Sequence, residues 1–256
     1  MISILVVIAV VLSGASASSF DVTSFGAVGD GVHDCTLAIR RAAAAVAENG
    51  GGTLLFPRSS TTSLTTYLSG SFNVTSHTIV RVEAGVTILG HSKGELWPLV
   101  DPNRVWPQFG HGSDCTLGDE DCRLMHQALI FSWNSTNITL SGGGTVDGNG
   151  ASWWQGCAGD LSKPPCSGHA RPHLVFISSA SNIRLLDLTF RNSPDWSLHM
   201  SSVSNLRVKN VKVLAPALHA PNTDGIDLDC VQDAIVEDSE FSVGDDALCV
   251  KSGWNV

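Results

Sequence analysis

Four stretches of the sequence repeat one another and decide the fold: TNITLSGGGT at 136–145, SNIRLLDLTF at 181–190, SNLRVKNVKV at 204–213 and QDAIVEDSEF at 232–241. Their Asn or Asp residues align at 137, 182, 205 and 233, at intervals of 45, 23 and 28 residues. Because 45 is about two units of 22 or 23, one further repeat is expected between the first two stretches. Such intervals, with Asn, Gly and Ser at the corners, are typical of a solenoid of stacked parallel strands.

A second series of short apolar stretches lies between these repeats. In HLVFIS, WSLHMS, DGIDLD and DALCVKS, the residues Phe176, Leu198, Ile226 and Leu248 follow one another at 22, 28 and 22 residues. The alternative is an ordinary β-sandwich with regularly spaced strands. The solenoid is favoured because the apolar pattern and the corner Asn recur together, so we predict an all-β solenoid.

The one clearly helical stretch is CTLAIRRAAAAVAENGGG at 35–52. Asp34 or Thr36 can cap a helix over Leu37 to Glu48, and Asn49 with the following glycines stops it. A solenoid exposes a bare sheet edge and core at its end, which a helix can cover. The helix is therefore expected to cap the first rung, after which GGTLLFP at 51–57 and TIVRVEAGVTILG at 78–90 begin the coil.

Composition and the first residues predict one secreted domain. The chain has 256 residues, of which 43% are hydrophobic and 15% charged, so a single folded core is expected. Residues 1–12 are apolar but too short for a membrane span, and Ala15 and Ala17 provide a signal-peptidase pattern. We expect a signal peptide at 1–17, a secreted or cell-wall protein at 18–256, no membrane after cleavage, and acceptor sequons at Asn73, Asn134 and Asn137.

Charge and cysteines limit the partners further. A net charge of −9 argues against nucleic acid, whose phosphates require Lys and Arg. The seven cysteines would be oxidised outside the cell, and the plausible local bridges are Cys115 with Cys122 and Cys157 with Cys166. Buried free thiols are the alternative. No CxxC pair or His-rich cluster predicts zinc, so no metal and no cofactor are expected.

The acidic residues concentrate in PNTDGIDLDC at 221–230 and SVGDDALCVKSG at 242–253. If Ile226 lies under Leu248, then Asp224 lies under Asp246, about 4.8 Å away across one rung. Asp245 would join them only if a bulge or turn at Gly244 redirects its side chain.

The same register predicts pairing partners for two further residues of PNTDGIDLDC. Asp229 meets Lys251, an opposite-charge pair for which a supporting role is expected, and Asp227 meets Cys249.

Stacked carboxylates predict acid–base chemistry. Turn preferences account for Asn222 and Gly225, yet they give no reason to place like charges on adjacent rungs. Repulsion there should raise the pKa of one carboxyl, which can then donate a proton near neutral pH. Glycoside hydrolysis uses one carboxylic acid and one carboxylate base, separated by roughly 6.5 to 9.5 Å for inversion and less for retention.

At this point the sequence resembles the polygalacturonases of glycoside hydrolase family 28. NTDG at 222–225 followed by GDD at 244–246 is similar to two signature motifs of that family. FGAVGDGVHDCTLAI at 25–39, GGGTLLFP at 50–57, YLSGSF at 67–72, GGGTVDGNGASWW at 142–154 and RPHLVF at 171–176 resemble its opening and middle. The resemblance implies a right-handed parallel β-helix over the mature chain.

The resemblance also implies roles for individual residues. Asp245 would be the general acid, with Asp224 and Asp246 holding and deprotonating the attacking water in an inverting hydrolysis of α-1,4-linked galacturonan. Asn222 and Gly244 would shape the strand ends that present them. The implied partner is pectic polysaccharide, and the protein is expected to act as a monomer.

One difference from the family's pattern leaves alternative functions open. The family's downstream Gly-His-Gly and Arg-Ile-Lys motifs are absent, so the C-terminal rungs of the helix are expected to be missing and activity to be impaired. A non-catalytic carbohydrate-binding or structural β-helix derived from such an enzyme therefore stays open. A pectate lyase needs an Arg base beside calcium-binding carboxylates, and no Arg is expected near the cluster of Asp224 to Asp246.

Overall fold

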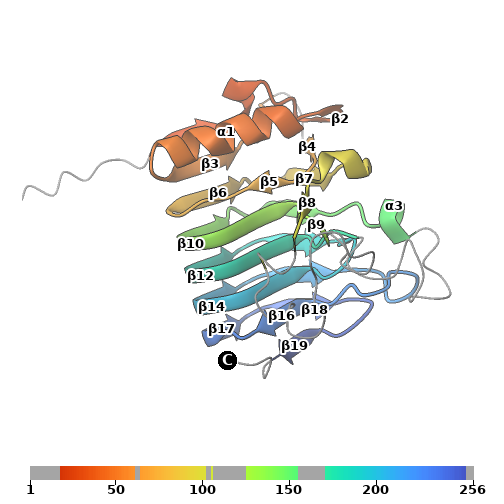
Figure 1. The fold of residues 1–256 in the computed structure, drawn as a ribbon. Helices are drawn as coiled ribbons and strands as arrows, with labels where there is room; N and C mark the ends of the chain where they lie inside the picture. The colour runs from red at the N-terminus through yellow and green to blue at the C-terminus, as the bar shows by residue number, and fades with distance from the viewer. Residues whose placement is uncertain (1–17, 61–63, 102–104, 106–124, 155–170, 252–256) are drawn as a thin grey trace, which may run out of the picture.

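The computed structural model describes residues 18–60, 64–101, 105, 125–154 and 171–251. Within these ranges the chain winds into a coil whose parallel strands stack one above another, as Figure 1 shows from the side. The predicted signal peptide at 1–17 and the predicted bridges of Cys115 with Cys122 and of Cys157 with Cys166 lie outside the described residues. The all-β solenoid predicted from the repeats is confirmed as a right-handed parallel β-helix.

Two long sheets form the walls of the coil. The ten-stranded sheet runs in the order β1-β3-β6-β10-β12-β14-β16-β19, with β5 on β10 and β17 on β14. Its strands are β1 (Ser19–Asp21), β3 (Gly52–Phe56), β5 (Phe72–Asn73), β6 (Thr78–Val82), β10 (Ile130–Ser141), β12 (Val175–Leu186), β14 (Leu198–Lys209), β16 (Ile226–Asp229), β17 (Gln232–Glu237) and β19 (Leu248–Lys251).

The second wall has seven strands in the order β18-β15-β13-β11-β7-β4-β2. These are β2 (Asp30–Asp34), β4 (Thr65–Ser69), β7 (Val86–Gly90), β11 (Thr145–Asp147), β13 (Thr189–Arg191), β15 (Lys212–Leu214) and β18 (Glu240–Ser242). An antiparallel pair, β8 (Leu99–Val100) and β9 (Met125–His126), lies outside the coil. The helical segments are η1 (Val22–Phe25), α1 (Thr36–Glu48), η2 (Gly94–Leu96) and α3 (Ala151–Trp154).

The strand register corrects two details of the predicted repeat. Strands β10 and β12 pair directly, with Ile138 opposite Ile183, so no rung lies between the first two repeats and the 45 residues form a single turn. The extra length is the connection that contains α3. Phe176 pairs with His199, whereas Leu198 pairs with Val175. Val175 faces the interior of the coil and Phe176 belongs to a separate cluster outside it, so the aromatic residue misled the alignment.

The aligned corner residues adopt the left-handed conformation. Asn137, Asn182, Asn205 and Asp233 have φ between 55° and 58°. This conformation is costly for most residues but tolerated by Asn and Asp, and it lets β10, β12 and β14 bend. The side chains also stack, since Asn205 Nδ2 donates to Asn182 Oδ1 at 2.6 Å. The corner prediction is therefore confirmed.

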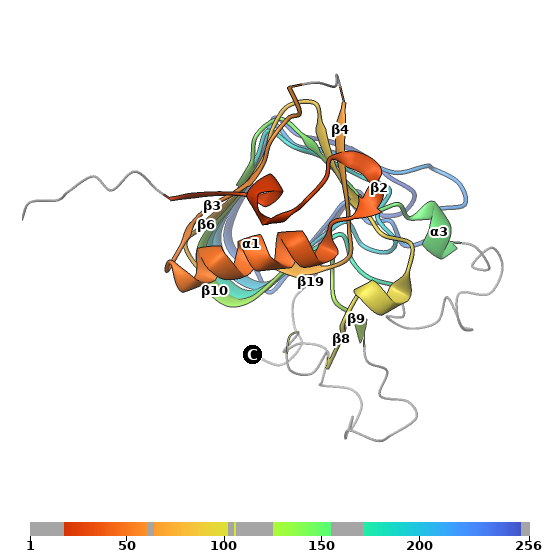
Figure 2. The ribbon, with the colours of Figure 1, turned by 90° about the horizontal axis from the view of Figure 1, so that it is seen from above.

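Helix α1 caps the coil as predicted. It begins at Thr36, one residue earlier than expected, and Asp34 Oδ1 accepts the Thr36 N–H at 2.9 Å. Ile39, Ala42 and Val46 are buried against the core inside the coil. Figure 2 shows α1 lying across the open end of the stack, so the helix shields the first rung from water.

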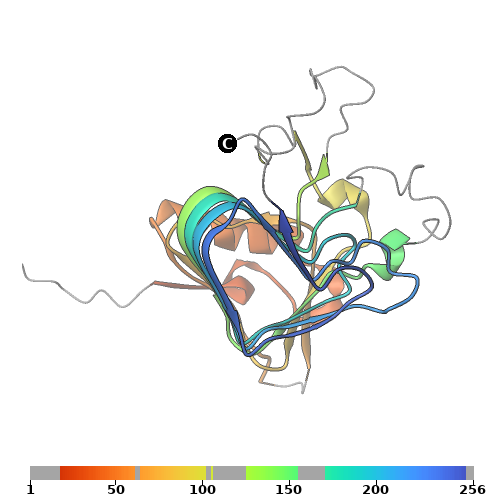
Figure 3. The same cartoon turned by 90° about the horizontal axis from the view of Figure 1, so that it is seen from below.

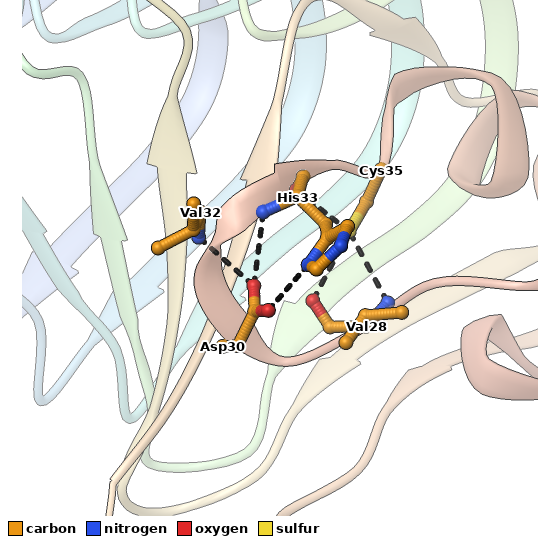
Figure 4. A network of polar contacts seen from close by, with 5 residues as sticks. All are labelled: Val28, Asp30, Val32, His33 and Cys35. Carbon is orange, nitrogen blue, oxygen red and sulfur yellow. Dashed lines mark hydrogen bonds and ion pairs between the residues drawn. The ribbon is translucent and has the colours of Figure 1, made fainter.

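A polar turn fixes the chain just before this helix (Figure 4). Asp30 Oδ1 accepts the N–H groups of Val32 and His33, both at 2.9 Å, and its other oxygen contacts the His33 ring. These bonds stabilise the carboxylate and lower the pKa of Asp30 to about 2. Cys35 is buried, donates to the carbonyl of Val28 at 3.2 Å, and is a free thiol, as are Cys230 and Cys249.

The predicted acceptor sequons lie on the surface. Asn73, Asn134 and Asn137 are all exposed, and the last two occupy left-handed corners of β10. Asn73 accepts a hydrogen bond from Gln127, and Asn137 contacts His77 at 3.3 Å. No helix among the described residues is long and apolar enough to cross a membrane. Glycosylation of these residues stays a prediction.

Candidate active site

Two turns on neighbouring rungs present the predicted aspartates. Ile226 pairs with Leu248, which confirms the predicted 22-residue register. Asp224 lies two residues before the start of β16, and Asp245 and Asp246 lie in the turn before β19. Each of these three side chains places one carboxylate oxygen within 4.8 Å of the other two. Asp224 is buried, whereas Asp245 and Asp246 are exposed to solvent.

The two turns are bound to each other by backbone contacts. The N–H of Gly225 donates to the Asp246 carbonyl at 2.8 Å, and the N–H of Gly244 donates to Thr223 Oγ1 at 3.0 Å. A Cβ on Gly225 would lie 2.3 Å from the Ala247 oxygen. Glycine is required there because the rungs approach so closely. The chain bends at Gly244, as anticipated, and Asp245 joins the cluster.

Burial changes the acidity of Asp224. Its side chain is 6% exposed, and burial together with the charges of Asp227 and Asp245 raises its pKa to about 6. Cys249 and Lys251 act in the opposite direction. Within the described part of the chain, Asp224 Oδ1 has no hydrogen-bond partner. The group thus exchanges protons near neutral pH and is a stronger base than an ordinary aspartate.

Lys251 does not pair with Asp229 as predicted. The backbone register does place them opposite each other, but Lys251 Nζ forms its ion pair with Asp227. Asp229 instead lies 3.6 Å from His199 Nε2. Asp227 and Asp229 are two residues apart in one strand, so their side chains lie on the same face of the sheet and the long lysine can reach either. It takes Asp227, a fully buried carboxylate whose pKa is raised by burial.

The same lysine also contacts an aromatic ring. Lys251 Nζ lies 3.4 Å from the centre of the Trp196 ring, which stacks on His173. His199 stacks in turn on Phe176, with 4.5 Å between ring centres. These rings line the outer face of the sheet beneath the acidic cluster. His173 and Trp196 are 23 residues apart, which is a repeat interval that the sequence pattern could have revealed.

Arg171 is the cation that the sequence reasoning missed. It is 3% exposed and donates to the carbonyls of Pro194 and Pro221 and to Asn222 Oδ1, at 2.7 to 2.8 Å. Asp195 lies 3.4 Å from its guanidinium. Neither acidic motif contains an arginine, and this one comes from the turn two rungs before that of Asp224, where it contacts Asn222 of the first motif. Arg171 connects three successive turns and holds Asn222 two residues before Asp224.

Asp195 is a further acidic group close to the site. It is 5% exposed, and burial raises its pKa to about 7, although Arg171 opposes the shift. The charges of Asp224 and Asp227 raise it further. Asp195 was not predicted because it lies outside both acidic motifs.

Cys249 completes the group. Its sulfur lies 3.5 Å from Asp224 Oδ2 and 3.5 Å from Asp246 Oδ2. Burial and then the charge of Asp227 raise the pKa of this thiol, so it is protonated at neutral pH and can donate a hydrogen bond.

The fold and the site together define the class of protein: parallel β-helices in which aspartates converge from two neighbouring turns. The comparisons give the family. The family model for glycosyl hydrolases family 28 matches residues 113–256. A probable polygalacturonase from Vitis vinifera is 33% identical over 243 residues, covering 93% of this chain and 45% of that protein. The chain belongs to glycosyl hydrolases family 28.

Other relatives agree with this assignment. A probable polygalacturonase from Arabidopsis thaliana is 29% identical and covers 93% of this chain and 44% of that protein. The family 28 exopolygalacturonase of Yersinia enterocolitica has a similar fold, with a TM-score of 0.74 and 20% identity over 93% of this chain and 46% of that one. The chain thus spans about half the length of the curated relatives it matches.

Proposed function

We propose that this chain carries the acid–base residues of a secreted glycoside hydrolase that cleaves α-1,4-galacturonosyl linkages of pectic polysaccharide. The observation that carries the proposal is the convergence of Asp224, Asp245 and Asp246 from two stacked turns. Family membership and similarity to proteins named polygalacturonases support the substrate class. Asn222 and Gly244 support the turns, and Lys251 supports the site through Asp227.

The roles proposed for the three aspartates follow the solvent exposure of their side chains. Asp245 is exposed and would protonate the leaving glycosidic oxygen. Asp224 and Asp246 flank the same space and would hold the attacking water and take its proton. The raised pKa of Asp224 suits this role above about pH 6, where the group is ionised and more basic than an ordinary aspartate.

We propose inversion of the anomeric carbon, as the resemblance implies. The nearest carboxylate oxygens of the three aspartates lie within 4.8 Å, closer than the roughly 6.5 to 9.5 Å between carboxyl groups of inverting pairs. Nearest-oxygen distances are lower bounds on those separations, so the stereochemistry must be measured directly. Proton NMR of the first product decides it: the β anomer from an α linkage supports inversion, and the α anomer contradicts it.

Replacement of the proposed acid tests the function. Asp245→Asn should lower the rate at which reducing ends are released from polygalacturonate by about 100-fold or more, because the leaving oxygen then receives no proton. Asp233→Asn, an exposed corner aspartate on β17, is the matched control and should retain activity. Undiminished turnover by Asp245→Asn would refute the assignment of the acid.

One observation argues against tight binding of an anionic sugar at this cluster. Among the described residues near the cluster, the cations Arg171 and Lys251 already pair with Asp195 and Asp227. An anionic sugar therefore finds no uncommitted cation in this part of the chain. Binding of galacturonate oligomers without any release of reducing ends by the unmodified protein would favour the carbohydrate-binding alternative.

A further inference from the structure

We propose that Asp224, Asp227 and Cys249 form a binding site for a thiophilic divalent cation of the zinc class. One ligand atom from each of the three lies within 4.8 Å of the others. The sequence shows no zinc pattern because the ligands come from two rungs: Cys249 follows Asp227 by 22 residues and Asp224 by 25 residues. The inference goes beyond the proposed hydrolysis and concerns what else can occupy the site.

The distance between sulfur and oxygen fits a metal ion. Zinc bonds of about 2.3 Å to sulfur and about 2.0 Å to oxygen, at a tetrahedral angle, separate those two ligand atoms by about 3.5 Å. Cys249 Sγ lies 3.5 Å from Asp224 Oδ2, so an ion could be accommodated with little movement of these two side chains. Three protein ligands would leave a fourth position open to water.

Two buried oxygens provide independent support. Asp224 is 6% exposed and Asp227 is fully buried, yet Asp224 Oδ1 and Asp227 Oδ2 have no hydrogen-bond partner among the described residues. Lys251 occupies only the other oxygen of Asp227. Burying a charged carboxylate with an oxygen left unpartnered is costly. Although Cys249 contacts the other oxygen of Asp224, a bound cation would offset this cost by neutralising the buried carboxylates.

The charge of the surroundings also favours a cation. Asp224, Asp227, Asp245 and Asp246 contribute four carboxyl groups, and Lys251 is the one basic side chain ion-paired with any of them in the described structure. Cys249 is protonated before binding, and on coordination its thiol proton passes to solvent as the metal–sulfur bond forms. Sulfur ligation selects zinc or cadmium over calcium or magnesium. The bound ion would occupy Asp224 and so inhibit the proposed hydrolysis.

Titration of the purified full chain with Cd²⁺ tests the site without substrate. We expect binding of one ion at this site to produce the ultraviolet charge-transfer band of a cadmium–thiolate bond. Cys249→Ala should remove this band and weaken Cd²⁺ binding roughly tenfold or more. Cys230→Ala, which removes a half-buried free thiol outside both acidic groups, should leave both unchanged. An unchanged band and affinity in Cys249→Ala would overturn the proposal.

A second measurement needs no variant. Zn²⁺ should displace Cd²⁺ from the unmodified chain and so remove the charge-transfer band, whereas an equal concentration of Ca²⁺ should leave the band unchanged. A band that persists in excess Zn²⁺ would contradict the site, and so would displacement of Cd²⁺ by an equal concentration of Ca²⁺. None of these readouts requires catalysis, so their failure is distinguishable from failure of the proposed function.

Discussion

Burial beside other carboxylates governs the properties of Asp224. The residue follows a turn that the next rung covers, and its neighbours Asp227 and Asp245 are acidic. Both effects favour its protonated form. Asp227 escapes part of this penalty because Lys251 pairs with it, whereas Asp224 has no ion-pair partner in the described structure.

This protonation equilibrium predicts a pH-dependent stability change. The pKa of Asp224 is about 6 in the folded protein, against an ordinary value of 3.8. Its favourable contribution is therefore complete below about pH 4 and is lost as the pH rises through about 6. Asp224→Asn should raise the free energy of unfolding at about pH 7 by about 2 kcal/mol, but not at about pH 3.5.

Urea unfolding at both pH values measures this effect. Asp233→Asn is the control, because the side chain of Asp233 is exposed. A gain for Asp224→Asn that is equal at both pH values would contradict the role of ionisation.

Arg171 gives a second prediction for single residues. Arg171→Met leaves Asp195 buried without its cation and should lower the free energy of unfolding by about 3–5 kcal/mol. Adding Asp195→Asn removes the unpaired charge and should recover part of that loss. Chemical denaturation of the single and double variants measures the difference. A double variant no more stable than Arg171→Met would show that the charge of Asp195 does not matter.

At the scale of elements, left-handed corners convert long strands into a coil. Strands β10, β12 and β14 each have twelve residues and turn at Asn or Ser residues with positive φ. The aligned Asn side chains then hydrogen-bond from one rung to the next. The sequence predicted these corners because their residue type is unusual, but it could not give the length of the connections between rungs.

The corner of β14 offers a test that separates conformation from hydrogen bonding. Asn205→Ala loses the bond to Asn182 and places a Cβ-bearing residue without local polar contacts at φ 55°, which should cost about 1–2 kcal/mol of unfolding free energy. Asn205→Gly tolerates the conformation and loses only the bond, so its cost should be smaller. Thermal denaturation compares the two, and an equal loss would contradict a conformational contribution.

At the scale of the whole molecule, the two ends of the described stack differ. Helix α1 covers the first rung. Figure 3 shows the stack from the end opposite α1, with its last turns in blue. Within the described residues, β19 is the outer strand of the ten-stranded sheet, and its Leu248 and Val250 are exposed. Val250 is 73% exposed. Exposed apolar residues on an edge strand favour pairing with another chain.

A charged residue introduced into the edge strand β19 should reduce self-association of the chain. Val250→Lys is expected to lower the associated fraction in sedimentation velocity at high protein concentration, with little change in the thermal midpoint. Ile79→Lys is the control, since Ile79 is 37% exposed on β6, which is paired on both sides. If both variants reduce association equally, general surface charge and not the edge strand is responsible.

By itself the sequence determined the class of fold, the capping helix and the register that stacks Asp224 beside Asp246. These features follow from local patterns: repeated apolar positions, corner Asn residues and turn glycines. Only the tertiary structure decided that the 45-residue interval is one turn, that Arg171 holds Asn222, and that Lys251 pairs with Asp227 and not with Asp229. Loop lengths and diagonal partners depend on burial and on neighbouring rungs, and the raised pKa of Asp224 arises only when those rungs exclude water.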